Sequence, residues 1–387
     1  MNVLFAAVEM SPLAKVGGLG DVVGSLPRAL RACGLDVRVA MPLHGAIDRD
    51  VLALTLVADG VDVPWHDGPQ RANVWRAEVR DVPVYLIENE RYFDREKVYG
   101  YEDDDERMLF FCDALLACAP SLDFAPAVIQ AHDWHAALLL ARLAAAPEHP
   151  WALSGRVYTI HNLAQQGELT APLLARAGFA APQLRPPSGL PDKVALSGMA
   201  QGIIHADLIN TVSETYAKEI LTSEYGADLD SLLRARSDVL SGIVNGIDYD
   251  EFDPATDGAI ARHYSADSID SLDGRAEDKR ALQVEAGLPA RAEAMLFGAV
   301  TRLFAQKGID LAAVAFDALL SQLDLQLVVL GTGDEKVHGM LLRLQAKYPA
   351  KVKIWLDFNP ALGQRIDRKS TRLNSSHSRA SRMPSSA

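Results

Sequence analysis

The chain has 387 residues, of which 49% are hydrophobic, and a formal net charge of -13 at pH 7. This length allows two domains with sizeable cores, and the acidic balance argues against nucleic acid or an anionic membrane as a bulk partner. The cysteines form no CxxC pair, no basic signal-peptide start is present and no apolar run reaches membrane-spanning length, so we expect a cytoplasmic protein of undetermined oligomeric state.

Short apolar runs in the first 245 residues predict strands buried on both faces, because they are rich in Val and Ile and mostly do not alternate with polar residues. Helical patterns between them, at Glu106–Ala119 and His135–Ala146, predict a doubly wound α/β domain over residues 1–245. Pro27 predicts that the first helix either restarts after a Ser25 cap or kinks. The expected strands are NVLFAAV (2–8), DVRVAMP (36–42), VPVYLIE (82–88), AVIQAHD (127–133), GRVYTIH (155–161) and ADLINTVS (206–213).

The second part of the chain predicts an incomplete repeat of the same architecture. Residues 246–290 are expected to form a linker that ends in a helix at Ala276–Ala286. Residues 291–367 are expected to form a partial Rossmann-like domain, with strands at 294–302, 325–331 and 351–356 and a helix at 308–323. Residues 368–387 hold seven Ser, five Lys or Arg and no acidic residue. This composition predicts a disordered tail of foreign sequence rather than a core-forming segment.

The segment KVGGLGD (15–21) follows the first strand and opens the first helix. Glycines permit a left-handed backbone and close approach of N–H groups to a ligand. The helix N-terminus and Lys15 add positive charge, so Lys15, Gly17 and Gly18 beside Asp21 predict a phosphate site. The spacing matches neither the Walker pattern nor GxGxxG, and so predicts neither an ATPase nor a dehydrogenase. The alternative is a tight turn with a solvated lysine.

A second cationic loop occurs in VTRLFAQKGIDL, where Arg302 ends a strand and Lys307 precedes a helix. Two cations beside a helix N-terminus also predict a phosphate site, and the alternative is a surface pair. One such site at the head of each α/β domain predicts a diphosphate ligand in a cleft between the domains.

Polar residues also follow two other strands. AHDWH contains His132, Asp133 and His135, but no third metal ligand at sensible spacing and no GxSxG nucleophile motif accompany it, so we expect a polar lining rather than a metal or a triad. His161 and Asn162 directly follow the strand RVYTI and can donate to hydroxyls or to a developing charge. The alternative for these side chains is ordinary packing.

Eight segments occur in the same order in bacterial glycogen synthases and plant starch synthases, and the chain resembles this family from Met1 to about Ile366. The resemblance implies a GT-B fold of two Rossmann-like domains. It also implies a retaining glycosyltransferase that moves glucose from ADP-glucose to the non-reducing end of an α-1,4-glucan such as glycogen, without cofactor or metal. The segments are KVGGLGDV, AHDWH, TIHNLAQQGE, NTVSETYAKEI, IVNGIDYDEFDP, RLFAQKGIDL, GTGD and DFNPALGQRI.

The resemblance also implies roles for individual residues. His161 is expected to steady an oxocarbenium-like transition state beside the transferred glucose, and it counts with Lys15, Arg302 and Lys307 as catalytic. The expected substrate contacts are Lys15, Gly17, Gly18 and Asp21 around the donor phosphates or the acceptor, Asp133, His161 and Asn162 at the sugar, Asn245 at the interdomain turn, and Arg302 and Lys307 at the diphosphate.

The family carries a further motif of the form E-x7-E, near a sequence like EPCGLTQLYG, which is absent after Ile366. We therefore expect this chain to transfer little glucose and its second domain to be partly molten. The alternatives are a GT-B transferase that uses UDP-glucose and a non-catalytic glucan-binding chain. A nicotinamide dehydrogenase is disfavoured because no acidic ribose ligand is evident after DVRVAMP.

Overall fold

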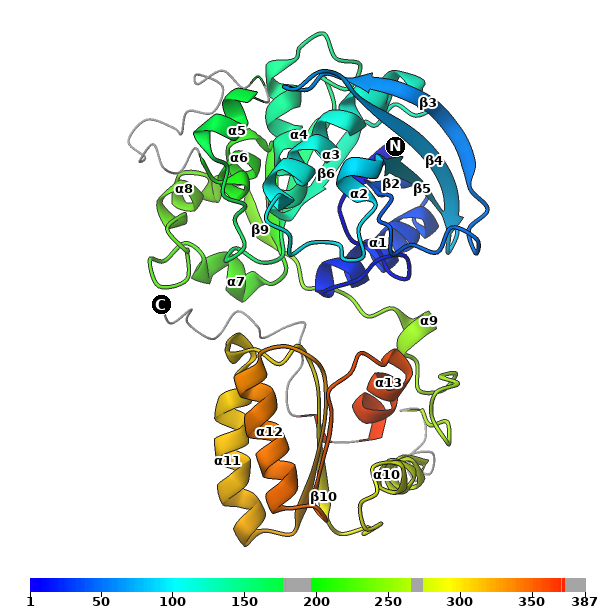
Figure 1. Ribbon diagram of the computed structural model, residues 1–387, viewed down its shortest axis with the longest axis vertical. Coiled ribbons are helices and arrows are strands. Elements are labelled where there is room, and N and C mark those ends of the chain that lie inside the picture. Colours follow the sequence, from blue (N-terminus) through cyan, green and yellow to red (C-terminus); the bar gives the residue numbers. More distant parts are fainter. Residues whose placement is uncertain (177, 179–195, 266–273, 370, 373–387) are drawn as a thin grey trace. The chain divides into compact units, whose positions relative to one another are not determined.

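The computed structural model describes residues 1–176, 178, 196–265, 274–369 and 371–372. The chain divides into two compact units, Met1–Asn245 and Gly246–Ala387, and each unit has its own sheet (Figure 1).

The sheet of the first unit has nine strands in the order β3-β4-β5-β2-β1-β6-β7-β8-β9. All neighbours from β5 to β9 in this order are parallel, whereas β3, β4 and β5 pair antiparallel. The strands are β1 (Asn2–Ala6), β2 (Asp36–Pro42), β3 (Thr55–Val63), β4 (Gln70–Val79), β5 (Val82–Glu88), β6 (Val128–His132), β7 (Gly155–Ile160), β8 (Leu208–Thr211) and β9 (Leu240–Gly242). The described α-helices are α1 (Gly18–Ala32), α2 (Glu90–Phe93), α3 (Asp104–Cys118), α4 (Asp133–Ala145), α5 (Ala171–Arg176), α6 (Gly198–His205), α7 (Glu214–Glu219) and α8 (Asp230–Ala235).

Helix α1 neither restarts nor stops at Pro27. The helix is continuous through this residue, and the Ser25 hydroxyl donates to the Asp21 carbonyl one turn earlier instead of capping a new helix. The prediction of a Ser25 cap is therefore wrong. Just before Ser25, Gly24 lets α1 pack closely against the backbone of Ser11, since a Cβ at Gly24 would lie 2.6 Å from the Ser11 carbonyl oxygen.

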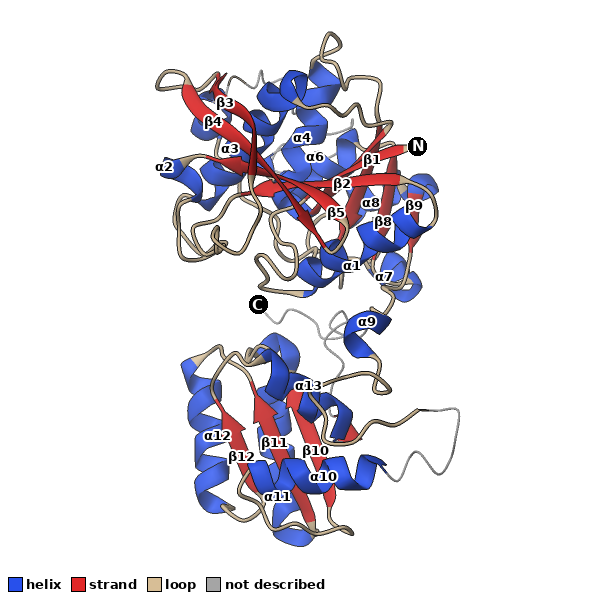
Figure 2. Cartoon of the chain, turned by 90° about the vertical axis from the view of Figure 1, so that its right-hand side faces the viewer, coloured by secondary structure: helices blue, strands red, loops and turns tan. Residues whose placement is uncertain are grey.

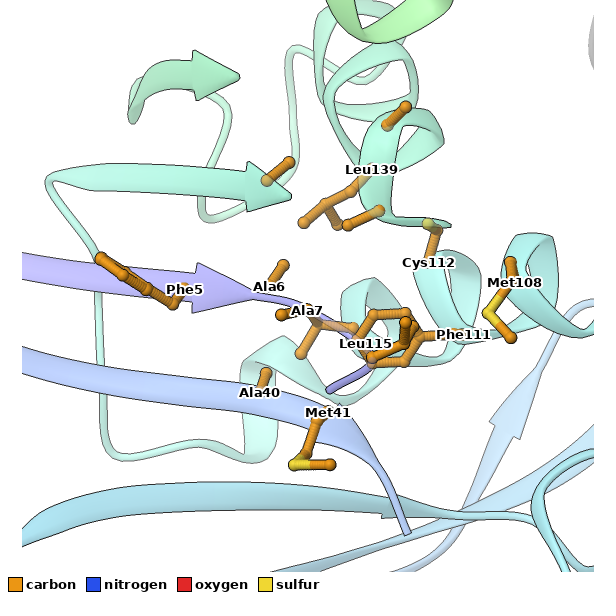
Figure 3. Packing of buried hydrophobic residues seen from close by; sticks show 14 of the residues in the cluster. Phe5, Ala6, Ala7, Ala40, Met41, Met108, Phe111, Cys112, Leu115 and Leu139 are labelled. Atoms are coloured by element: carbon orange, nitrogen blue, oxygen red, sulfur yellow. The ribbon is translucent and has the colours of Figure 1, made fainter. Parts of the chain in front are cut away.

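The core of the first unit lies between its parallel strands and helices α3 and α4. Phe5 and Ala6 of β1 and Met41 of β2 belong to this core cluster, and Figure 3 shows Ala6 on the side of the strands that faces these helices. Phe111 and Leu139, from α3 and α4, are fully buried in the same cluster. This packing fixes the strands from which the polar residues at their carboxyl ends project.

The second unit is a smaller α/β layer structure with the strand order β12-β11-β10-β13, all parallel (Figure 2). Helices α11 and α12 cover one face of the sheet, and α10 and α13 cover the other (Figure 1). β11 is buried along its whole length, as expected for a central parallel strand. The elements are α9 (Tyr249–Phe252), α10 (Gly274–Glu285), β10 (Met295–Val300), α11 (Ile309–Gln322), β11 (Leu325–Leu330), α12 (Glu335–Lys347), β12 (Val352–Trp355), α13 (Pro360–Lys369) and β13 (Thr371–Arg372).

The helix expected at Ala276–Ala286 is confirmed as α10, and Leu282 and Ala286 pack against the sheet. The end of the second unit carries more structure than its composition predicts. In the expected disordered tail, α13 continues to Lys369, and β13 pairs with β10 through Thr371 and Arg372 because that edge of β10 offers unpaired backbone groups. Residues 373–387 lie outside the described residues.

Candidate active site

Three adjacent strands of the first unit bring most of the predicted site residues together. β6 lies between β1 and β7, and the three run parallel, so their carboxyl ends share one edge of the sheet. The glycine loop (residues 15–21) follows β1, Asp133 follows β6, and His161 and Asn162 follow β7. Ligands of open α/β sheets bind at such an edge.

The glycine loop is held by Glu9, a residue that no sequence motif considered above contains. Its carboxylate oxygen Oε2 accepts from the amides of Val16 at 2.6 Å and Gly17 at 2.8 Å. A Cβ at Gly20 would lie 3.2 Å from the same oxygen, so a glycine there leaves room for the carboxylate. The position of Glu9, directly after a strand that leads into the loop, is the signal that could have identified it.

The charged residues of the glycine loop pair with each other. Lys15 Nζ lies 2.5 Å from Asp21 Oδ1, and both side chains are partly exposed. The loop backbone is extended rather than left-handed at Gly17, with φ at -144°. A left-handed backbone is therefore not the reason for this glycine, and no heavy atom would lie within 4 Å of a Cβ added there.

Tyr99 joins the loop to the rest of the edge. Its hydroxyl donates to Glu9 Oε1 at 2.6 Å, and its ring stacks on His135 at 5.4 Å. The segment that carries Tyr99 is tied down by Arg107, whose buried guanidinium donates to the carbonyls of Tyr92 and Val98.

Asp133 organises the backbone after β7. Its Oδ1 accepts from the amides of His161 at 2.7 Å and Asn162 at 3.3 Å. Asp133 has a φ of +53°, a strained conformation for a residue other than glycine, and its side chain is buried. Burial raises its pKa to about 7, the two amide hydrogen bonds oppose that shift, and the charge of Glu9 adds to it.

His132 and His161 form a hydrogen-bonded imidazole pair. His132 Nδ1 and His161 Nε2 are 3.0 Å apart, so one ring donates and the other accepts. Burial lowers the pKa of His161 to about 4 and lowers the pKa of His132 well below its usual range, with the neighbouring ring adding to the shift at His132. Both rings are thus neutral at physiological pH, and His161 presents a polar but uncharged group at the edge.

Two more histidines surround this pair. Burial lowers the pKa of His135 to about 3 and that of His44 to about 4. His44 Nε2 is 2.9 Å from the carbonyl of Val8, just after β1. His132 and His135 of AHDWH are therefore neutral, buried rings, as the packing alternative predicts for His132, and a polar lining by these two side chains stays a prediction.

The second unit places Arg302 and Lys307 in one loop after β10. Lys307 ends a single turn of 3-10 helix, and Gly308, at a φ of +68°, begins α11. Burial and the charge of Arg302 both lower the pKa of Lys307. Among the residues that the structure describes, the exposed Arg302 side chain has no hydrogen-bonded or ion-paired partner.

Asn245 is the last residue of the first unit. It follows β9, which pairs parallel with β8, and it is half-buried. Within the part of the chain that the structure describes, no hydrogen bond joins its side chain to the residues after β1, β6 and β7.

Comparisons with known proteins identify the family. A family model described as the starch synthase catalytic domain matches residues 2–235. A glycogen synthase of Moorella thermoacetica is 41% identical over 368 residues, which are 95% of this chain and 74% of that protein. A protein named glycogen synthase 2, from Geobacter sulfurreducens, is 41% identical over 373 residues, with 95% and 76% covered.

This chain belongs to the glycogen synthase and starch synthase family. A solved structure, the catalytic domain of starch synthase IV from Arabidopsis thaliana bound to ADP and acarbose, superposes with a TM-score of 0.87 at 32% identity, covering 95% of this chain and 76% of that one. The likeness confirms the α/β fold of the GT-B type. The chain spans about three quarters of the length of these relatives.

Membership of the family makes the chain a glycosyltransferase by descent, and places the Glu9, Asp133 and His161 cluster within its matched starch synthase domain. None of the described helices is long and apolar enough to cross a membrane.

Proposed function

We propose that this glycogen synthase relative transfers glucose from ADP-glucose to the non-reducing end of an α-1,4-glucan, with retention of the anomeric configuration. The observation that carries the proposal is that Arg302 and Lys307 lie in one loop after β10, where burial first and the charge of Arg302 second lower the pKa of Lys307, so that a diphosphate would offset the repulsion between the two cations. ADP is the nucleotide bound in the starch synthase IV structure, and this supports ADP-glucose as the donor.

The reaction breaks the bond between the anomeric carbon of glucose and a diphosphate oxygen, a glucan hydroxyl oxygen forms the new bond to that carbon, and the hydroxyl proton passes to the departing ADP. Negative charge develops on the leaving ADP, and Arg302 and Lys307 are proposed to stabilise it. Positive charge develops on the sugar ring. His161, held neutral by burial, would donate or accept a hydrogen bond there without adding a repelling charge.

The remaining contacts are proposals of the same kind. Lys15 is bridged to Asp21 at 2.5 Å, so it would have to exchange this partner for a phosphate or a sugar hydroxyl. Gly18 begins α1, where first-turn amides can face a ligand, whereas Gly17 is the N-cap and its own amide donates to Glu9, so Gly17 is proposed only to allow a close approach of the substrate. Asp133 and Asn162 are proposed to line the sugar site, with Asn245 at the end of the first unit.

The test compares donors with one preparation of the purified chain. ADP-glucose or UDP-glucose, each labelled in the glucose, is incubated with glycogen, and incorporated label is counted against a boiled control. We expect incorporation to be slow, in line with the expectation from the sequence, to be at least tenfold greater from ADP-glucose than from UDP-glucose, and to be abolished in H161A.

Three other outcomes would redirect the proposal. Greater incorporation from UDP-glucose would show that UDP-glucose, and not ADP-glucose, is the donor. Retention of the chain by glycogen in a native gel, without incorporation from either donor, would favour a non-catalytic glucan-binding chain. Incorporation that survives in H161A would remove that residue from the mechanism.

A further inference from the structure

Glu9 is a buried acid that receives hydrogen bonds from two directions. Its residue is only 2% exposed. The amides of Val16 and Gly17 donate to one carboxylate oxygen, and the hydroxyl of Tyr99 donates to the other at 2.6 Å. Among the described residues, no lysine, arginine or histidine forms an ion pair with it.

The carboxylate of Glu9 is therefore held by neutral hydrogen-bond donors and not by a cation. A buried carboxylate in this position needs strong hydrogen bonds to offset its desolvation, and bonds to an ionised acceptor are the strongest available. Gly17 is the N-cap of α1 and supplies no side-chain cap itself, so Glu9 provides the negative charge that the helix N-terminus favours. Glu9 thereby holds the two amides immediately before α1, whereas the amides of the first turn itself stay unoccupied by this carboxylate.

The same carboxylate lies close to the other half of the site. Besides burial, the charge of Glu9 contributes to the raised pKa of Asp133. Asp133 in turn fixes the amides of His161 and Asn162. The carboxyl group of Glu9 thus fixes the backbone after β1, and that of Asp133 fixes the backbone after β7.

The amides bound to Glu9 are not available to a substrate phosphate. The groups that a ligand could use in the glycine loop are the first-turn amides of α1, which have no acceptor within the helix, and the Lys15 ammonium if the ligand replaces its partner Asp21. The orientation of both depends on the backbone at Val16 and Gly17, where Glu9 is bonded.

We infer that Glu9 is a positioning residue of the transferase site, which fixes the glycine loop so that Lys15 and the N-terminus of α1 face the substrate, with Tyr99 fixing Glu9 in turn. Glu9 does so without touching the substrate. The part of this inference that concerns substrate rests on the proposed function, whereas the part that concerns the loop does not.

Hydrogen–deuterium exchange tests the loop part without reference to activity. In E9A the amides of Val16 and Gly17 lose their acceptor, and we expect peptides covering residues 13–20 to exchange at least tenfold faster than in the parent chain. E9Q keeps a side-chain oxygen in place and should stay within threefold of the parent. Y99F should be intermediate. E78Q, at an exposed glutamate of β4, is the matched control and should change nothing.

Parent-like exchange of residues 13–20 in E9A would overturn the inference. Faster exchange spread equally over β6 and α4 would also overturn it, because it would show general loss of stability rather than release of the loop.

The substrate part is tested by a double-mutant cycle on kcat/KM with K15A. If Glu9 acts through the loop that carries Lys15, the double variant E9A/K15A should be no less active than K15A alone within threefold, although E9A alone loses at least tenfold. Independent, multiplying losses would overturn the inference. Absence of transfer by the parent chain would instead count against the proposed function, and the exchange experiment would still decide the role of Glu9 in the loop.

Discussion

Asp133 combines a strained backbone conformation with a raised side-chain pKa. Its left-handed conformation and its two accepted amide bonds place a carboxyl where water cannot solvate it, and its pKa is raised to about 7. The neutral acid is therefore the form that the fold favours. A folded pKa above the unfolded value means that the native state binds more protons, so stability from this group falls as pH rises from about 4 to about 7.

An asparagine should imitate the neutral acid. Asn tolerates a left-handed backbone and keeps an oxygen for the amides of His161 and Asn162. We expect D133N to gain stability over the parent as pH rises, by about 1 to 3 kcal/mol between pH 5 and pH 8. D133A should lose about 1 to 3 kcal/mol at pH 5, because both amides lose their acceptor, and this loss should shrink as pH rises, because the same titrating carboxyl is absent. Urea unfolding at three pH values measures both, and a D133N gain that is independent of pH would contradict the assignment.

Gly167 is the glycine whose absence of a side chain matters most to the loop after β7. A Cβ there would lie 2.1 Å from the nearest atom of the Trp134 ring, and φ is +64°. Gly60 has a similar φ of +59°, but a Cβ there meets only the Arg71 side chain, at 3.7 Å.

Comparing the alanine variants of these two glycines separates the cost of backbone strain from the cost of a steric clash. G60A should destabilise the first unit by about 1 kcal/mol through φ alone. G167A carries the same strain plus displacement of Trp134, so we expect a loss larger by about 1 to 3 kcal/mol and a changed tryptophan fluorescence. Equal losses for the two variants would show that Trp134 moves aside freely.

At the scale of elements, buried parallel strands are the part that the sequence predicts best. β2 and β5 have the predicted bounds, since their side chains are largely apolar on both faces. β3 and β4 are not predicted, because they form the outer antiparallel end of the sheet, and β3 mixes exposed acidic residues with Gly60. An edge strand needs only one buried face and so leaves a weaker signal.

The site residues also divide into some that the sequence predicts and some that only the fold reveals. His161, Asn162 and Asp133 can be read from their positions after apolar strands. Their closeness depends on the strand order that puts β6 between β1 and β7, and single-sequence patterns do not encode that order. Glu9 and Tyr99 interact across 90 positions of sequence and are evident only in the fold.

The loop between β10 and α11 is an element whose charges can be tested alone. Removing Arg302 should raise the pKa of Lys307 toward its usual value, because a repelling neighbour is lost. It should also remove a charged hydrogen-bond donor to the diphosphate, worth about 1.5 to 3 kcal/mol, which corresponds to roughly 10- to 100-fold in affinity. We expect R302A to weaken ADP binding by this factor in calorimetry, with a smaller dependence on salt.

The matched control is R343A, at an arginine on α12 of the same unit. ADP binding by R302A as tight as by R343A would remove Arg302 from the diphosphate site.

At the scale of the whole molecule, the first unit concentrates buried neutral histidines. Burial lowers the pKa of four rings, and in the unfolded chain these rings titrate near their ordinary value of 6.5. Below that pH the unfolded chain therefore binds more protons than the fold, and stability falls as pH decreases. The four residues are His44, His132, His135 and His161.

Asp133 opposes this trend with one proton, because its folded pKa of about 7 lies above its ordinary value of 3.8. With four histidines against one carboxyl, the unfolded chain holds about three more protons than the fold between roughly pH 6 and pH 4, so the free energy of unfolding should fall by about 4 kcal/mol per pH unit. Urea unfolding of the chain, followed by tryptophan fluorescence between pH 6 and pH 4, measures this slope.

Two variants should move that slope in opposite directions. H44Q removes one titrating ring and keeps a donor for the Val8 carbonyl, so the slope should decrease by about 1.4 kcal/mol per pH unit. D133N removes the opposing carboxyl, and the slope should increase by the same amount. Unchanged slopes in both variants would mean that neither His44 nor Asp133 contributes to the acid sensitivity of the chain.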